Sequence, residues 1–190
     1  MPIPFRDADE AEALGTAGYL RIDASQDNRV FRGALFLVNV RGEPIEFTYN
    51  EVKIPSTFLW RQEDIRRHAA RNLTTSLLAT CRKVPQFIIC LAEEVDHQLF
   101  CNEIHLSIPV GRIASPSKST PHSELEVQAD IEDPQPLHLF WFPGKPADES
   151  PENRLLSKLV TRGLLLEPFD RALVGLREAY PDQVGRDPTE

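Results

Sequence analysis

A predicted β-hairpin between residues 31 and 49 is the feature that most limits how this chain can fold. An unbroken apolar run over most of 31–40 precedes turn-forming residues at 41–44, and residues 45–49 then alternate apolar and polar side chains. A strand that is apolar throughout is buried on both faces, whereas an alternating strand keeps one polar face. We therefore expect 31–40 to lie inside a sheet, with 45–49 antiparallel to it.

The period of the apolar residues changes from that of a strand to that of a helix after Pro55. Apolar side chains recur every fourth residue, which predicts an amphipathic helix over about 57–82. A second buried-strand pattern follows at 87–92. A helix between two such strands indicates a crossover onto the same sheet.

The second half of the chain carries weaker strand signals and two clear helix signals. Even-numbered apolar residues predict a strand over 98–108, and 138–142 predicts the last strand. Ser150, followed by proline and glutamate, is typical of a helix start, and Glu167-Pro168 opens a final helix.

These elements predict an α/β or α+β fold in which a mixed sheet of five to six strands carries one central helix and two C-terminal helices. The pattern also predicts how the chain is divided. The expected parts are a flexible arm (1–17), a core sheet-helix domain (18–113), an acidic Pro-rich loop (114–136), the last strand with the C-terminal helices (137–181) and a frayed tail (182–190).

Composition narrows the class of protein. The chain has 190 residues and a formal net charge of −8, which argues against constitutive binding of duplex DNA through phosphate neutralisation. An odd count of three cysteines suits a reducing, cytoplasmic compartment better than a disulfide framework. No apolar run approaches the ~18 residues of a membrane span, so no membrane association is expected.

The order of these elements resembles the opening of ribonuclease H-like domains over residues 18–98. The matching features are Asp23-Ala24-Ser25, a glycine-led strand at 33–37, a turn at Arg41-Gly42, a third strand, a helix, and a buried strand that runs into acidic residues. In that superfamily, acids of the first strand, first helix and fourth strand converge to hold two divalent ions. The resemblance implies a metal-dependent nuclease that acts on nucleic acid.

Carried over position by position, the resemblance implies one acid from each of these elements. The candidates are Asp23, then Glu63 or Asp64, then Glu94 or Asp96, with Asp170 from a late helix as a fourth. Asp23, Glu94 and Asp96 would hold Mg²⁺ or Mn²⁺, which activates water and stabilises a leaving oxygen. The alternative interpretation is that these acids are solvated surface carboxylates, since Glu63 and Arg67 also have the i,i+4 spacing of an exposed salt bridge.

Two further groups of residues have the right chemistry for binding. His97, Cys101 and His105 are zinc-ligand types, but their spacing matches no standard finger or ribbon, which favours a structural role over zinc. Segment 57–83 is basic, and Arg66, Arg67 and Arg71 are the candidate nucleic-acid contacts. The interleaved aromatic residues that would stack on bases are missing there, which favours a solvated helix face.

Two functional interpretations remain. The first is a cytoplasmic, non-enzymatic protein-interaction or accessory subunit with another protein as its partner and no assured cofactor, because the sequence contains no specific catalytic motif. The alternative is a divalent-metal-dependent nuclease of ribonuclease H-like fold, with Mg²⁺ or Mn²⁺ as its cofactor. The sequence leaves open whether the chain is an enzyme.

Overall fold

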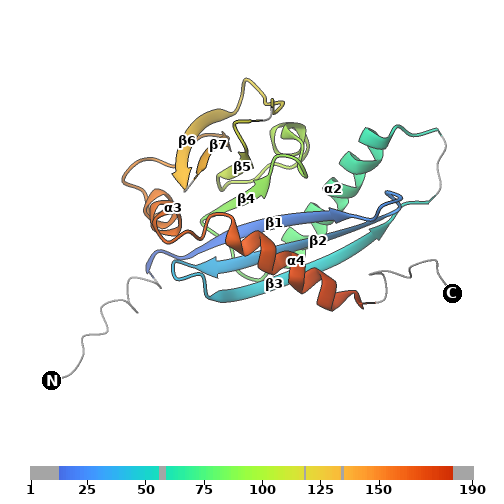
Figure 1. Cartoon of the computed structure of the whole chain (residues 1–190), viewed down its shortest axis with the longest axis horizontal. Helices are drawn as coiled ribbons and strands as arrows, with labels where there is room; N and C mark the ends of the chain where they lie inside the picture. Colours follow the sequence, from blue (N-terminus) through green and yellow to red (C-terminus); the bar gives the residue numbers. More distant parts are fainter. Residues whose placement is uncertain (1–12, 56–58, 118, 134, 182–190) are drawn as a thin grey trace.

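A mixed β-sheet forms the centre of the molecule (Figure 1). The structure is a computed structural model that describes residues 13–55, 59–117, 119–133 and 135–181. Within these residues the sheet has seven strands in the order β3-β2-β1-β4-β5-β7-β6. The strands are β1 (Thr16–Ala24), β2 (Val30–Asn39), β3 (Pro44–Lys53), β4 (Phe87–Leu91), β5 (Val110–Ala114), β6 (Val127–Asp133) and β7 (Gln135–Phe142).

The direction of the strands determines where their ends meet. Strands β1, β2 and β3 form an antiparallel meander, whereas β4 pairs parallel with β1 and β5 pairs parallel with β4. The carboxyl ends of β1, β4 and β5 therefore lie side by side at one end of the strands. Open α/β sheets commonly bind ligands at such an end.

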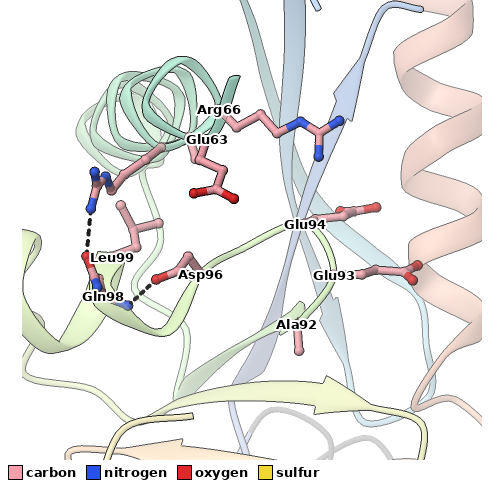
Figure 2. A pocket seen from close by; sticks show the side chains of 10 residues that line it. Glu63, Arg66, Ala92, Glu93, Glu94, Asp96, Gln98 and Leu99 are labelled. Atoms are coloured by element: carbon pink, nitrogen blue, oxygen red, sulfur yellow. Dashed lines mark hydrogen bonds between the residues drawn. The ribbon is translucent and has the colours of Figure 1, made fainter. Parts of the chain in front are cut away.

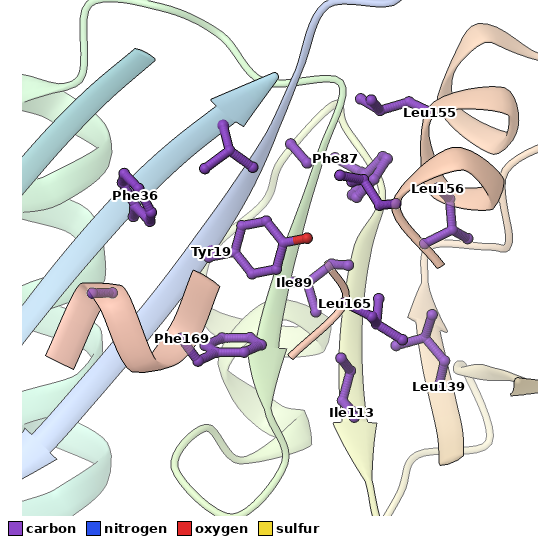
Figure 3. Close-up of a cluster of buried hydrophobic side chains, with 14 of the residues drawn as sticks. Tyr19, Phe36, Phe87, Ile89, Ile113, Leu139, Leu155, Leu156, Leu165 and Phe169 are labelled. Atoms are coloured by element: carbon purple, nitrogen blue, oxygen red, sulfur yellow. The ribbon is translucent and has the colours of Figure 1, made fainter. Parts of the chain in front are cut away.

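Helices cover both faces of the sheet (Figure 1). Helix α2 (Gln62–Thr80) covers one face, and α3 (Pro151–Thr161) and α4 (Glu167–Ala179) cover the other. Side chains alternate between these faces along β1: Leu20 lies in the core beneath α2, and Tyr19 packs edge-on against a phenylalanine of α4 (Figure 3). By the same alternation, Arg21 and Asp23 project on the α4 side of the sheet.

The sequence-based fold class is confirmed, although the sheet has more strands than the five or six expected. The hairpin at 31–49 and the strand at 87–92 are present, and the central helix begins at Gln62 rather than near residue 57. The Ser150 hydroxyl caps α3 by accepting a hydrogen bond from the Asn153 amide at 3.1 Å. No helix in the described residues is both long and apolar enough to cross a membrane.

The predicted strand at 98–108 is wrong. Its first half is a π-helical turn, η1 (Leu99–Glu103), and the strand that pairs with β4 is β5. The alternating apolar residues of 104–108 pack against the α2-side core without forming a strand. Strand β5 does not show the expected apolar pattern because Gly111 and a buried Arg112 interrupt it.

Within the segment 114–136, which the sequence predicts to be an acidic Pro-rich loop, Val127–Asp133 form β6, which pairs antiparallel with β7. β6 is an edge strand, and charged residues are common on edge strands because they discourage pairing with another chain. Its acidic composition therefore resembles that of a loop. The predicted arm at 1–17 falls mostly on residues 1–12, which lie outside the described residues, as does the predicted tail at 182–190.

Candidate functional site at the ends of β1 and β4

A cavity of about 320 Å³ lies between α2 and the turn that follows β4 (Figure 2). Four carboxylates and two guanidinium groups are among its lining residues, which include Glu63, Arg66, Arg67, Glu93, Glu94 and Asp96. The cavity is therefore strongly charged. It lies at the edge of the sheet where β1 and β4 end.

Glu94 links the ends of these two strands. The ladder between β1 and β4 ends at the pair Leu20 and Cys90, and the Glu94 side chain continues it by accepting the Ile22 backbone N–H at 2.9 Å through Oε2. Its other oxygen, Oε1, lies 3.0 Å from Nη1 of Arg21. Both side chains are largely buried, at 12% exposure for Glu94 and 18% for Arg21. The Glu94 carboxylate is thus fixed by the end of β1.

The surroundings of Glu94 disfavour its negative charge. Burial raises the pKa of the Glu94 carboxyl group to about 7, and the charges of Glu93 and Asp23 add to this increase. The Ile22 N–H and the Arg21 guanidinium lower the pKa, but their effect is smaller than that of burial. A positive charge added beside Glu94 would therefore stabilise the ionised carboxylate. A strongly raised pKa of this kind is common among functional carboxylates.

The structure brings some of the predicted acids together and separates others. Asp23 is half-buried at the end of β1, close enough for its charge to affect Glu94. Glu63 approaches the cavity from α2, and Asp96 lies on its rim, where its carboxylate accepts the Gln98 backbone N–H at 2.8 Å (Figure 2). Asp64 faces elsewhere, with Oδ1 2.7 Å from Nη2 of Arg67.

Asp170 does not join this group. It is exposed on α4, and its neighbour Arg171 donates to the Gly42 carbonyl at 2.7 Å in the turn between β2 and β3. That turn adjoins the amino end of β1, because Thr16 pairs with Asn39. Asp170 is therefore at the opposite end of β1 from Asp23.

Asp23 and Glu94 are the two carboxylates at the strand ends that could hold a divalent cation. Among the described residues, no three His, Cys, Asp or Glu side chains form a group that could hold a metal ion. Mg²⁺, however, is commonly bound by one or two carboxylates together with water and substrate phosphates. Asp23 and Glu94 supply this minimal donor set, and the destabilised charge of buried Glu94 suits a cation.

The three candidate arginines have different partners. Arg67 is held by Asp64 and by Gln98 Oε1, the latter at 2.7 Å, and Nε of Arg71 lies 3.9 Å from Glu103. Arg66 is exposed and makes a long contact of 3.4 Å to the side-chain oxygen of Asn28 in the turn between β1 and β2. Arg66 therefore has the guanidinium most available to a ligand at the cavity.

The candidate zinc ligands occupy different environments. His97 is half-buried with Nδ1 3.4 Å from Asp96, Cys101 is buried in η1, and His105 is exposed beyond it. Burial raises the pKa of the Cys101 thiol, which opposes formation of the thiolate that zinc binds. The three side chains do not form a metal-binding group within the described part of the chain.

Sequence reasoning missed Arg21 and Glu93. A strand period of two places residue 21 on the same face as Asp23, which is a usable signal for Arg21. Its pairing with Glu94 depends on the register of β1 against β4, which the sequence does not reveal. Glu93 directly precedes Glu94 and also lines the cavity, although the resemblance implies only Glu94 or Asp96 at this point of the chain.

Comparison with known proteins identifies the fold. No family model matches the chain, and no curated protein matches its sequence. The structure of Endonuclease V from Bacillus subtilis is similar, with a TM-score of 0.55, 14% identity, and 92% of this chain and 85% of that chain covered. Endonuclease V from Streptomyces avermitilis gives a TM-score of 0.54 and 11% identity, with 95% of each chain covered.

Both neighbours have a ribonuclease H-like fold, and at these identities the likeness establishes the fold alone. It supports the weak ribonuclease H-like resemblance of residues 18–98. The interpretation of the chain as a non-enzymatic interaction or accessory subunit is contradicted, because the similar folds belong to nucleases. That interpretation relied on missing motifs, and a carboxylate site assembled from separate strand ends leaves no compact motif in the sequence.

Proposed function

We propose that this chain is a nuclease that hydrolyses phosphodiester bonds with a divalent ion, Mg²⁺ or Mn²⁺, bound by Asp23 and Glu94. One observation carries the proposal: two half-buried carboxylates lie at the carboxyl ends of adjacent parallel strands in a ribonuclease H-like fold. The resemblance in the sequence implies acids at these two positions.

Each residue named in this proposal has a distinct task, and Asp23 acts from the end of β1 rather than from the lining of the cavity. Asp23 and Glu94 bind the ion, which supplies activation of water and neutralisation of charge on the leaving oxygen when it is present. Arg66 contacts a phosphate of the substrate strand, because its guanidinium is exposed at the cavity and matches phosphate geometry. Arg67 and Arg71 contribute less, since neighbouring acids already neutralise them.

The test is cleavage of labelled single-stranded DNA, duplex DNA and RNA by the purified chain, with Mn²⁺, Mg²⁺ or EDTA. We expect cleavage that requires the divalent ion. Asp23→Asn and Glu94→Gln should each reduce the rate by about a hundredfold, which corresponds to ~2.7 kcal/mol of transition-state stabilisation. Arg66→Ala should raise KM with a smaller effect on kcat.

Asp170→Asn is the matched control, because it makes the same chemical change to an acid at the other end of β1. It should cleave at the wild-type rate. Absence of ion-dependent cleavage on all three substrates would refute the proposal, as would activity that persists in Asp23→Asn.

A further inference from the structure

The guanidinium of Arg21 lies directly beside Glu94, the carboxylate that we propose as a metal ligand. Its Nη1 lies 3.0 Å from Oε1 of Glu94, while the other carboxylate oxygen accepts the Ile22 N–H at 2.9 Å. Both oxygens of Glu94 are thus engaged by groups of β1. A cation that binds Glu94 through Oε1 would lie close to the Arg21 guanidinium, and the two positive charges would repel each other.

Arg21 also retains hydrogen-bonding capacity that the described residues do not use. Its Nε is buried and has no hydrogen-bond partner among them. Leaving a buried donor without an acceptor is costly, and such groups in native structures call for a specific explanation. A phosphate group provides several acceptor oxygens and matches the fork of a guanidinium.

We propose that Arg21 is the resident counter-ion of Glu94, that it competes with the divalent ion for this carboxylate, and that a substrate phosphate relieves the competition by binding Arg21. The identity of the competing ion rests on the proposed function. In this arrangement the metal binds weakly to the protein alone. It binds more tightly when a nucleic-acid phosphate engages the guanidinium.

The experiment measures Mn²⁺ affinity by isothermal titration calorimetry on the full chain without nucleic acid. Removal of a positive charge next to the ion in Arg21→Gln should lower the Kd for Mn²⁺ by about tenfold or more. Arg21→Lys keeps the charge and should stay within about threefold of wild type. Arg171→Gln is the control, since Arg171 also pairs with a glutamate and has a buried Nε, but at the other end of the sheet.

A second titration includes a hydrolysis-resistant phosphorothioate oligonucleotide. Wild type should gain Mn²⁺ affinity when the oligonucleotide is present, and Arg21→Gln should gain clearly less because its counter-ion is already gone. Melting curves in EDTA establish that each variant is folded, and Arg21→Lys provides the comparison if Arg21→Gln is unstable.

Two results would overturn the inference: unchanged or weaker Mn²⁺ binding in Arg21→Gln, or an equal gain in affinity with oligonucleotide for both proteins. These readouts are independent of cleavage. The expected affinities without any nuclease activity would preserve the role of Arg21 and remove the proposed function. Ion-dependent cleavage with unchanged affinities would do the reverse.

Discussion

Two arginine–glutamate pairs involve strands of the sheet, one at β5 and one at β1. They differ in how many of their hydrogen-bonding atoms have partners. Arg112 of β5 makes a two-pronged contact with Glu126, at 2.7 and 2.9 Å, and donates to the carbonyls of Val95 and Pro121 as well. Both side chains are almost fully buried, at 3% and 2% exposure. The Arg21–Glu94 pair has one ion-pair contact, an Arg21 Nε without a hydrogen-bond partner among the described residues, and a carboxyl pKa of about 7.

The difference agrees with a structural role for the Arg112–Glu126 pair and with the ligand-linked role that we propose for the Arg21–Glu94 pair. A buried ion pair holds its surroundings in place when most of its donors and acceptors are used, as in the Arg112 pair, which ties Pro121 and Glu126 to β5. A pair with spare donors and a destabilised charge has capacity for a ligand. Exposure alone would not distinguish the two, because both pairs are largely withdrawn from solvent.

The largest expected effect on stability comes from breaking the Arg112–Glu126 pair. Arg112→Leu leaves the buried carboxylate of Glu126 without its partner and should lower the free energy of unfolding by about 3–5 kcal/mol. Urea denaturation followed by circular dichroism measures this loss. Arg112→Lys should recover little of it, because an ammonium group cannot reproduce the two-pronged contact.

The double variant Arg112→Leu/Glu126→Leu serves as the control. Removing both charges should restore most of the stability, since an apolar replacement of a buried ion pair is often neutral. A loss under about 1 kcal/mol in Arg112→Leu would mean that the pair is not structural.

The second prediction concerns the pH dependence that Glu94 confers. Its pKa is raised from 4.5 to about 7, so the folded chain retains this proton to a higher pH than the unfolded chain. The stability linked to the protonated group is therefore fully present below pH 4.5 and is lost as the pH rises to about 7. Glu94→Gln removes the titration, so its stability relative to wild type should increase with pH, on the order of 3 kcal/mol across this window.

Urea denaturation of both proteins in EDTA at pH 5 and pH 8 tests this prediction. Glu126→Gln is a useful comparison, because it makes the same change in the Arg112–Glu126 pair. It should be destabilising at both pH values. A constant difference between Glu94→Gln and wild type over this range would contradict the raised pKa of Glu94.

The sequence predicted one of these pairs in part and missed the other. The resemblance to ribonuclease H-like domains implies Asp23 and either Glu94 or Asp96 as candidates, because it places acids on the first strand and after the buried strand at 87–92, and their role stays a prediction. Glu126 was assigned to a solvated acidic loop, although it is almost fully buried. Its burial depends on Arg112, which lies fourteen residues earlier in a strand that the apolar pattern did not reveal.

The remaining errors have the same physical origin. Local patterns identify strands and helices whose burial follows the usual period, such as β2, β4 and α2. They do not identify β5, where a glycine and a buried arginine interrupt the period, or β6, where the charges of an edge strand resemble those of a loop. Contacts between distant segments determine both elements, and the same is true of the pairing of Arg21 with Glu94.

The smallest expected effect is the change in stability of Arg21→Gln, and it is the most direct comparison of the two pairs. Glu94 can take up a proton near neutral pH, so loss of Arg21 need not leave an unpaired buried charge. We expect a loss of about 1 kcal/mol or less at pH 6, and a larger loss at pH 8, where the carboxyl group is ionised. Arg112→Leu should lose several-fold more stability at both pH values, because it removes both hydrogen bonds from Arg112 to a more deeply buried carboxylate. Urea denaturation of the two variants side by side measures the contrast, and losses of equal size at both pH values would show that the two pairs have the same structural role.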